Sequence, residues 1–399
     1  MLNTEEVARR LGVKPATVYA YVSRGLLVSE RNADGKGSLF AEADVEAFVT
    51  ARRRTALPGG TPPIQTGLTL IKDGALYFRG HDVSTLARAN SYESVAMLLW
   101  TGRLSQVALS PSADLLALAE AVTFPLPAAA RLTDRLRVIV AAAAAADPLR
   151  FDTAPTAVIA TGQTLLATMV AALPLRRPTE RPRDERFPLA GVLWTRLTAA
   201  TPTPAGIAAL NAALVLLADH DIAASTLAAR VAASTRAHPY AVVGAGLAAL
   251  DGPLHGAASG LAYAMLTEAV RSGDPMRTIS DRLRVGGVLP GFGHRLYPDG
   301  DPRAKLLLAL LRETHTDRAT LAVIDEVAAA VTQRSGVAPD IDFAVAAFAL
   351  LNDMDADAGE AIFAVARTAG WIAHALEEYS DRPSRFRPSG HYAGRAPVD

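Results

Sequence analysis

Two histidines of this chain stand in glycine-rich segments that could face a ligand. His255 lies in Gly252-Pro253-Leu254-His255-Gly256, and His294 lies in Pro290-Gly291-Phe292-Gly293-His294-Arg295. Because glycine carries no side chain, the backbone beside such an imidazole leaves room for close approach. A third segment, Pro339-Asp340-Ile341-Asp342-Phe343, places carboxylates in an apolar stretch. With a downstream arginine, these groups could abstract a proton next to a carbonyl, hold the enolate and bind an anion.

These three segments, in this order, resemble the signature segments of the citrate synthase family, which includes 2-methylcitrate synthase. Further segments agree in order along the chain, and the resemblance extends from about residue 65 to the C-terminus. They are Tyr77 to Asp82, Asp219-His220-Asp221 with Ser225-Thr226, Asp301-Pro302-Arg303, Ala366 to His374, and Arg387-Pro388 with Tyr392-Ala393-Gly394.

The resemblance implies a role for each matching residue. Asp342 matches the catalytic base, whereas the neighbouring Asp340 stands where the family commonly has asparagine. His255 matches the residue that hydrogen-bonds the acetyl-CoA thioester oxygen, and His294 the one that polarises the oxaloacetate ketone and protonates the developing alkoxide. A further histidine and three arginines match the oxaloacetate site, where guanidinium groups bind carboxylates bidentately and stay charged: His220, Arg303, Arg367 and Arg387.

Four positions depart from the family pattern. Ala223, Ala257 and Ser259 replace residues that are usual there, and Pro298 stands where a basic residue often follows the tyrosine. The contacts to the CoA phosphates are therefore not carried over. The resemblance also implies a homodimer, in which Arg387 reaches the oxaloacetate site of the neighbouring subunit.

The composition is that of an ordinary folded enzyme. Half of the 399 residues are apolar, and 40 Lys and Arg balance 40 Asp and Glu, so no global charge attracts the chain to nucleic acid or membrane. The chain has no cysteine, which excludes disulfides and thiolate metal sites, and no histidine pair has the helical spacing of a metal site. With no signal peptide and no apolar run of membrane-spanning length, we expect a cytoplasmic protein.

A segment rich in proline and glycine divides the chain. Residues 55–64 follow the basic run Arg52-Arg53-Arg54 and have the composition of a linker. We therefore expect an N-terminal unit at 1–54 and a larger one at 65–399. The resemblance implies that a small domain, inserted at about 257–365, closes over the substrates.

The N-terminal unit has the pattern of a helix-turn-helix. Thr4 can cap a first helix, and Pro15 suits the first turn of a second helix that ends near Gly25. A third apolar stripe holds Phe40, Val45 and Phe48. This pattern resembles the MerR/excisionase type, with residues 29–39 as a wing, and favours DNA binding through Pro15–Arg24. The alternative is a helical appendage for assembly or regulation, because nine basic against seven acidic residues is a small excess for a phosphate-binding surface.

The larger unit is predicted to be mostly α-helical. Leu68–Ile71 and Ala75–Phe78 flank Lys72-Asp73-Gly74 and predict a β-hairpin. Ser91 should cap a helix that runs through Trp100 and ends at Gly102, and alanine-rich stretches at 112–148, 155–172 and 205–250 suit packed helices. Gly244 to Ala249 matches a dinucleotide-binding pattern but opens no βαβ unit, so we reject it. The resemblance implies the citrate synthase fold.

Three functions follow as hypotheses. The first is an acyltransferase that condenses oxaloacetate with acetyl-CoA and water to citrate and CoA, with acyl-CoA as co-substrate and no permanently bound cofactor or metal. The second is 2-methylcitrate synthase, since acetyl and propionyl groups differ by one methylene, worth about 1–3 kcal/mol in a pocket. The third is a transcription regulator whose synthase-like body senses oxaloacetate or acyl-CoA. The presence of the base, Asp342, favours an enzyme over a sensor.

Overall fold

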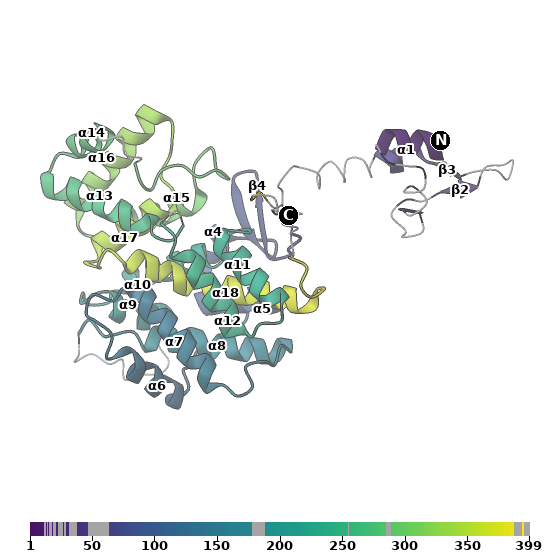
Figure 1. The fold of residues 1–399 in the computed structure, drawn as a ribbon. Coiled ribbons are helices and arrows are strands. Elements are labelled where there is room, and N and C mark those ends of the chain that lie inside the picture. Colours follow the sequence, from purple (N-terminus) through teal and green to yellow (C-terminus); the bar gives the residue numbers. More distant parts are fainter. Residues whose placement is uncertain are drawn as a thin grey trace. The chain divides into compact units, whose positions relative to one another are not determined.

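The computed structural model describes most of the larger unit and part of the smaller one. The chain forms two compact units, Met1–Gln65 with Pro388–Asp399, and Thr66–Arg387. Figure 1 shows the elements of both. The described residues are 1–11, 13, 15, 18, 21–22, 27, 29–31, 38–46, 64–177, 188–253, 255–284, 289–386 and 393–394.

The described part of the first unit combines helical segments with a small antiparallel sheet. Helix α1 spans Thr4–Leu11, and strands β1 (Leu2–Asn3), β3 (Ser38–Phe40) and β2 (Glu30–Arg31) pair in that order. The β2–β3 pair lies where the wing is expected. The buried apolar residues are Val7, Ala8, Val18, Leu27, Phe40 and Val45.

Two expectations for this unit need correction. Asn3, rather than Thr4, caps α1: its Oδ1 accepts the backbone N–H groups of Glu5 and Glu6 at 3.0 and 2.9 Å, and the Glu6 carboxylate accepts the N–H of Asn3 at 2.8 Å. Reciprocal bonds of this kind satisfy donors that a helix leaves open. Phe40 lies on β3 and not on a helical stripe with Val45. Phe48, residues 55–63 of the expected linker and most of the helix after Pro15 lie outside the described residues.

The second unit begins with the predicted hairpin. Strands β4 (Thr69–Lys72) and β5 (Ala75–Phe78) pair antiparallel, and β6 (His81–Asp82) adds a third strand beside β5. Asp73 and Gly74 both have positive φ, 51° and 75°. A two-residue turn with this geometry matches the natural twist of paired strands, which explains the Asp-Gly sequence.

The rest of the described second unit is helical. Helix α5 (Tyr92–Thr101) begins after Ser91, whose side chain accepts the N–H of Ser94, and ends at Gly102 with φ 78°, as predicted. The alanine-rich stretches are helices, and Gly244 to Ala249 lies inside one of them, which excludes the dinucleotide-binding turn. The other helices are α4 (Val83–Ala89), α6 (Ala113–Thr123), α7 (Leu132–Ala146), α8 (Pro155–Ala171), α9 (Leu189–Leu197), α10 (Pro204–Leu217), α11 (Ala224–Ser234), α12 (Pro239–Leu250), α13 (Ala258–Ser272), α14 (Pro275–Arg284), α15 (Pro302–Thr314), α16 (Arg318–Ser335), α17 (Ile341–Leu351) and α18 (Ala358–Ser380).

The helices of this unit fall into two groups. The long helix α18 packs against α5, α8, α10, α11 and α12, whereas α13 to α17 pack mainly on one another (Figure 1). Within the described residues, no helix is both long enough and apolar enough to cross a bilayer. The two groups meet where the predicted site residues gather.

Candidate active site

The structure brings six of the predicted site residues together between the two helix groups. His220 follows α10, Arg367 lies on α18, and His255 lies on the connection from α12 to α13. The second group supplies the other three: His294 on the segment before α15, Arg303 in the first turn of α15, and Asp342 in the first turn of α17. The seventh residue, Arg387, lies outside the described residues.

A histidine pair and a tyrosine join the two groups. The rings of His220 and His294 meet edge to face, with centroids 5.0 Å apart. His220 Nε2 lies 2.9 Å from the hydroxyl of Tyr297, and the guanidinium of Arg303 lies over the Tyr297 ring at 5.6 Å. Tyr297 was not among the predicted site residues, although its position three residues after His294 is the signal that could have found it.

The glycines beside His255 and His294 serve packing between chain segments. A Cβ on Gly256 would lie 2.5 Å from the carbonyl oxygen of Leu250, and one on Gly291 would lie 2.8 Å from Cβ of Phe343. Gly291 also has φ 84°, a conformation that suits glycine. The expectation that these glycines make room for a ligand is therefore wrong at Gly256 and Gly291, where they let two backbone segments approach each other.

His255 is held in one tautomer. The backbone N–H of Ser225 lies 3.4 Å from Nε2, and the Ser225 hydroxyl lies 2.8 Å from the same atom. Because a backbone N–H only donates, Nε2 accepts, and the ring proton lies on Nδ1. Burial and then the positive charge of Arg367 lower the pKa of His255 to about 4. The side chain is therefore a neutral donor through Nδ1–H near pH 7.

His294 is fixed in the opposite tautomer. The backbone N–H of Leu296 donates to Nδ1 at 3.2 Å, which leaves the proton on Nε2. Burial and then Arg303 lower the pKa of His294, and burial with the same arginine lowers the pKa of His220 well below its usual value. Three neutral imidazoles thus line one site. In two of them the proton is placed, on Nδ1 of His255 and on Nε2 of His294.

The two described arginines differ in what they already bind. Arg303 is buried and forms a bidentate pair with Asp301, with Nε–Oδ1 at 3.0 Å and Nη2–Oδ2 at 2.7 Å. Arg367 is 1% exposed, and its Nε donates to the carbonyl of Leu217 at 2.8 Å. Its Nη1 is buried and has no hydrogen-bond partner in the described part of the chain.

The unpaired nitrogen of Arg367 is a candidate contact for an anion. Burial lowers the pKa of Arg367 to about 10, so the group is still cationic at neutral pH. A buried charged donor without a partner is costly, and a carboxylate satisfies it with charge-assisted hydrogen bonds. The guanidinium also lies 4.6 Å from the ring of Phe363, whose centroid is 5.7 Å from that of His255. Arg367 and His255, where the resemblance places the thioester, therefore both contact the ring of Phe363.

Asp342 is a partly buried carboxyl group in the first turn of α17. Asp340 caps this helix: its Oδ1 accepts the N–H groups of Asp342 and Phe343 at 3.0 and 3.3 Å. Burial raises the pKa of Asp342, and the charge of Asp340 raises it further, whereas Arg303 and Arg367 oppose the shift. A carboxyl group with a raised pKa beside two cations suits a proton acceptor.

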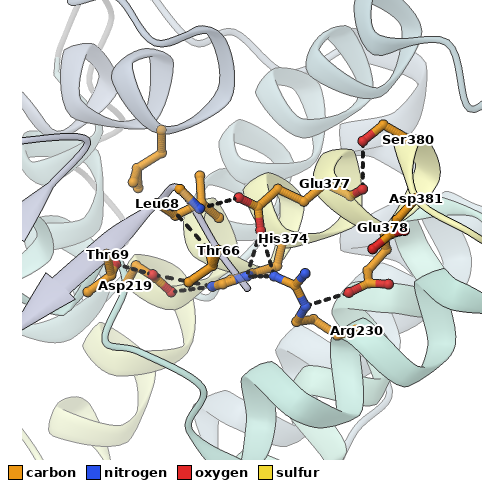
Figure 2. Close-up of polar contacts among 12 residues, drawn as sticks. Thr66, Leu68, Thr69, Asp219, Arg230, His374, Glu377, Glu378, Ser380 and Asp381 are labelled. Atoms are coloured by element: carbon orange, nitrogen blue, oxygen red, sulfur yellow. Dashed lines mark hydrogen bonds and ion pairs between the residues drawn. The ribbon is translucent and has the colours of Figure 1, made fainter. Parts of the chain in front are cut away.

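A buried polar network holds the loop that carries His220 (Figure 2). Asp219 accepts from His374 Nε2 at 3.2 Å and also from the Thr69 hydroxyl. Arg230 Nη1 lies 2.5 Å from His374 Nδ1, and Arg230 Nε lies 2.5 Å from Glu378 Oε1. Since arginine only donates, His374 carries its proton on Nε2, facing Asp219. The sequence signal for His374 was its spacing of two helical turns from Arg367 on one face of α18.

Breaking this network should destabilise the fold. Arg230 and Glu378 are 1% and 0% exposed. We expect Arg230→Leu to lower the free energy of unfolding by about 3–5 kcal/mol, because it removes one of the two cations of the buried Glu378 carboxylate, the other being Arg385, and leaves Nδ1 of the buried His374 without its donor. Denaturant titration measures the change. The control is Arg312→Leu, which breaks the exposed pair with Asp325 and should cost less than about 1 kcal/mol. Equal losses would show that the buried network contributes no more than a surface pair.

Three other histidines lie outside this site. His81 is exposed on β6, while His238 and His315 are partly exposed at helix ends, where Nδ1 accepts the N–H of Ala241 and of Asp317. Short-range backbone bonds at helix ends account for both, and neither takes part in the site.

Comparisons with known proteins show the family of this chain. The family model "Citrate synthase, C-terminal domain" matches residues 58–389, and a "Helix-turn-helix domain" model matches residues 1–53. The chain belongs to the citrate synthase family. The citrate synthase of Haloferax volcanii is 32% identical over 354 residues, covering 82% of this chain and 91% of the relative. The 2-methylcitrate synthase 2 of Corynebacterium glutamicum is 30% identical over 345 residues, covering 80% and 89%.

Solved citrate synthases share the fold. The enzyme of Thermoplasma acidophilum, solved as a ternary complex with carboxymethyl coenzyme A and oxaloacetate, superposes with a TM-score of 0.69. It is 24% identical, and the match covers 84% of this chain and 95% of that one. The expected citrate synthase fold is confirmed.

In the described part of the chain, no three His, Cys, Asp or Glu side chains are grouped to hold a metal ion.

Proposed function

We propose that this citrate synthase family member condenses oxaloacetate with an acyl-CoA thioester and water, releasing CoA. The unpaired buried Nη1 of Arg367, next to neutral histidines and the carboxyl group of Asp342, carries this proposal. One substrate must be anionic to satisfy the arginine, and the other must carry an acidic C–H to need the base. Oxaloacetate and an acyl-CoA meet these requirements.

The geometry supports one assignment of steps. Asp342 removes the α-proton of the thioester, and Nδ1–H of His255 hydrogen-bonds the enolate oxygen that forms. The new carbanion centre attacks the ketone of oxaloacetate, and Nε2–H of His294 donates its proton to the developing alkoxide. Water then hydrolyses the thioester: its hydroxyl bonds to the acyl carbon, the C–S bond breaks, and CoA leaves with a proton. Asp342 gives up the proton that it took from the thioester, and His294 regains the one that it donated. Stabilising the two oxygens with fixed neutral donors lowers both barriers.

The preference for one acyl-CoA over another is tested by measuring initial rates of CoA release. With acetyl-CoA as the preferred acyl donor the product is citrate, and we assign this activity to the protein. The rate of CoA release with oxaloacetate should be higher with acetyl-CoA than with propionyl-CoA at equal concentrations. A reversed preference would make the protein a 2-methylcitrate synthase, and release that does not depend on oxaloacetate would contradict a condensation.

We further propose that oxaloacetate binds first and draws the α13–α17 group toward the α18 group. His220 and Arg367 belong to one group, and His294, Arg303 and Asp342 to the other, so an anion between them favours approach. Closure would also exclude water from the thioester. Small-angle scattering with and without oxaloacetate should show compaction, and kinetics should be ordered. No compaction together with random-order kinetics would contradict this prediction.

The helix-turn-helix unit suggests a second activity, DNA binding. Its support is the family model over residues 1–53 and the β2–β3 pair beside α1. We expect that deleting residues 1–54 leaves synthase activity largely intact, because the unit has its own core. Activity assays on the truncated chain check this, and its collapse would mean that the unit is part of the catalytic assembly.

DNA binding itself is tested by selection from a random DNA pool with the full-length protein. Binding through phosphate contacts should weaken steeply with salt, since each neutralised phosphate releases counterions. A full-length protein that selects no sequence would contradict the regulatory role.

A further inference from the structure

Asp340 lies two residues before Asp342, the proposed base, and its charge raises the pKa of that carboxyl group. Its backbone N–H donates to the carbonyl of Gly291 at 2.9 Å, and its Oδ1 accepts two N–H groups of the first turn of α17. These bonds hold the carboxylate close to Asp342. They also tie the segment that leads to His294 to the helix that carries Asp342.

The cap does not require a charged residue. Asparagine and aspartate cap helices about equally well, because both offer Oδ1 to the open N–H groups. The second carboxylate therefore adds something that the cap does not need. Two carboxylates in a poorly solvated site disfavour each other's ionised form.

The other charges around Asp342 are largely engaged elsewhere. Asp301 and Arg303 from α15 face it, and they form a bidentate pair with each other at 2.7 and 3.0 Å. Asp301 also accepts the N–H of Ile341 at 3.2 Å. Arg367 from α18 is the remaining cation that faces Asp342, and it is the group proposed to bind oxaloacetate. With Asp342 and Asp301, Asp340 thus makes three carboxylates against the two cations Arg303 and Arg367.

We propose that Asp340 is a positioning residue that both orients the first turn of α17 and sets the pH range in which Asp342 can accept a proton. The proposal rests on the proposed function. Burial raises the pKa of Asp340 and of Asp342, and the charge of Asp340 raises the pKa of Asp342 further. Since a base acts only when ionised, activity rises with pH through the pKa of Asp342. An anionic Asp340 moves this rise to higher pH.

The test is the pH profile of kcat/KM for acyl-CoA at saturating oxaloacetate, compared between wild type and Asp340→Asn. The asparagine keeps the cap and removes the charge. We expect the acid limb to move to lower pH by about one unit. The matched control is Asp317→Asn, which removes a charge from the exposed cap of α16, where Oδ1 accepts the N–H of Thr320 at 3.0 Å. This control should leave the limb in place.

An acid limb that does not move in an active Asp340→Asn enzyme would overturn the proposal, as would an equal shift in Asp317→Asn.

A second measurement, of thermal stability, does not depend on turnover. An aspartate whose pKa is raised in the folded state stabilises the fold at low pH, and this stability is lost as pH rises through the folded pKa. Asp340→Asn should therefore gain melting temperature over wild type as pH rises. A difference that stays constant with pH contradicts the proposal even if no CoA is released, whereas absent CoA release alone contradicts the proposed function.

Discussion

Asp342→Asn should lower turnover by about 10²- to 10⁴-fold while oxaloacetate binding stays nearly intact. A positioned general base contributes an acceleration of this size, and asparagine has nearly the same shape but cannot accept the α-proton. The fold should tolerate the change, because the carboxyl group of Asp342 already resists ionisation and its backbone N–H bond to Asp340 is unchanged. Single-turnover kinetics and equilibrium binding of oxaloacetate measure the two effects separately.

The control for this prediction is Asp340→Asn at a pH where the wild type is fully active. There the base is ionised in both proteins, and the cap of α17 is preserved, so turnover should change far less than with Asp342→Asn. Equal losses at both positions would show that the wrong aspartate is assigned as the base.

Arg387→Ala should weaken oxaloacetate binding although the other residues proposed to bind oxaloacetate remain in place. The family resemblance assigns Arg387 to the oxaloacetate site of the neighbouring subunit of a homodimer, and we propose the same here. A dicarboxylate needs cations on opposite sides, and a C-terminal segment at a two-fold interface can supply one from outside the pocket. Binding of oxaloacetate and its KM should both show the loss. The control is Arg385→Ala. It removes a neighbouring arginine that pairs with Glu378, and it should weaken oxaloacetate binding less than Arg387→Ala.

Mixing two inactive variants tests whether the site is shared. In a heterodimer of Asp342→Ala and Arg387→Ala chains, one site carries both defects and the other carries neither. Partial activity should therefore return when the two proteins exchange subunits. If mixing under exchange conditions restores nothing, Arg387 acts within its own chain and the shared site is wrong.

Local patterns in the sequence predicted local structure well. The Asp73-Gly74 turn, the Ser91 cap and the Gly102 terminus each depend on residues within a few positions of one another, and all three occur as expected. The cap of α1 was misplaced by one residue, because Asn3 and Thr4 are both good caps. Only the reciprocal bond from Glu6 decides between them.

Contacts between distant segments could not be predicted in this way. The resemblance named His220, yet the partner that orients it, Tyr297, lies 77 residues away. Likewise Ser225 fixes the tautomer of His255 from 30 residues away, and His374 holds Asp219 from 155 residues away. The reason for Gly256 was also hidden, because its close neighbour, Leu250, is apparent only when the connection between the helices has folded.

The central claim is most directly tested by the balance of products formed from acetyl-CoA and oxaloacetate. The wild-type protein should release one CoA for each citrate formed. Thiol titration measures the CoA, and mass spectrometry measures the citrate. Asp342→Asn should form neither product at a comparable rate. CoA released without citrate, or products formed equally fast by Asp342→Asn, would contradict a condensation that uses this carboxylate as its base.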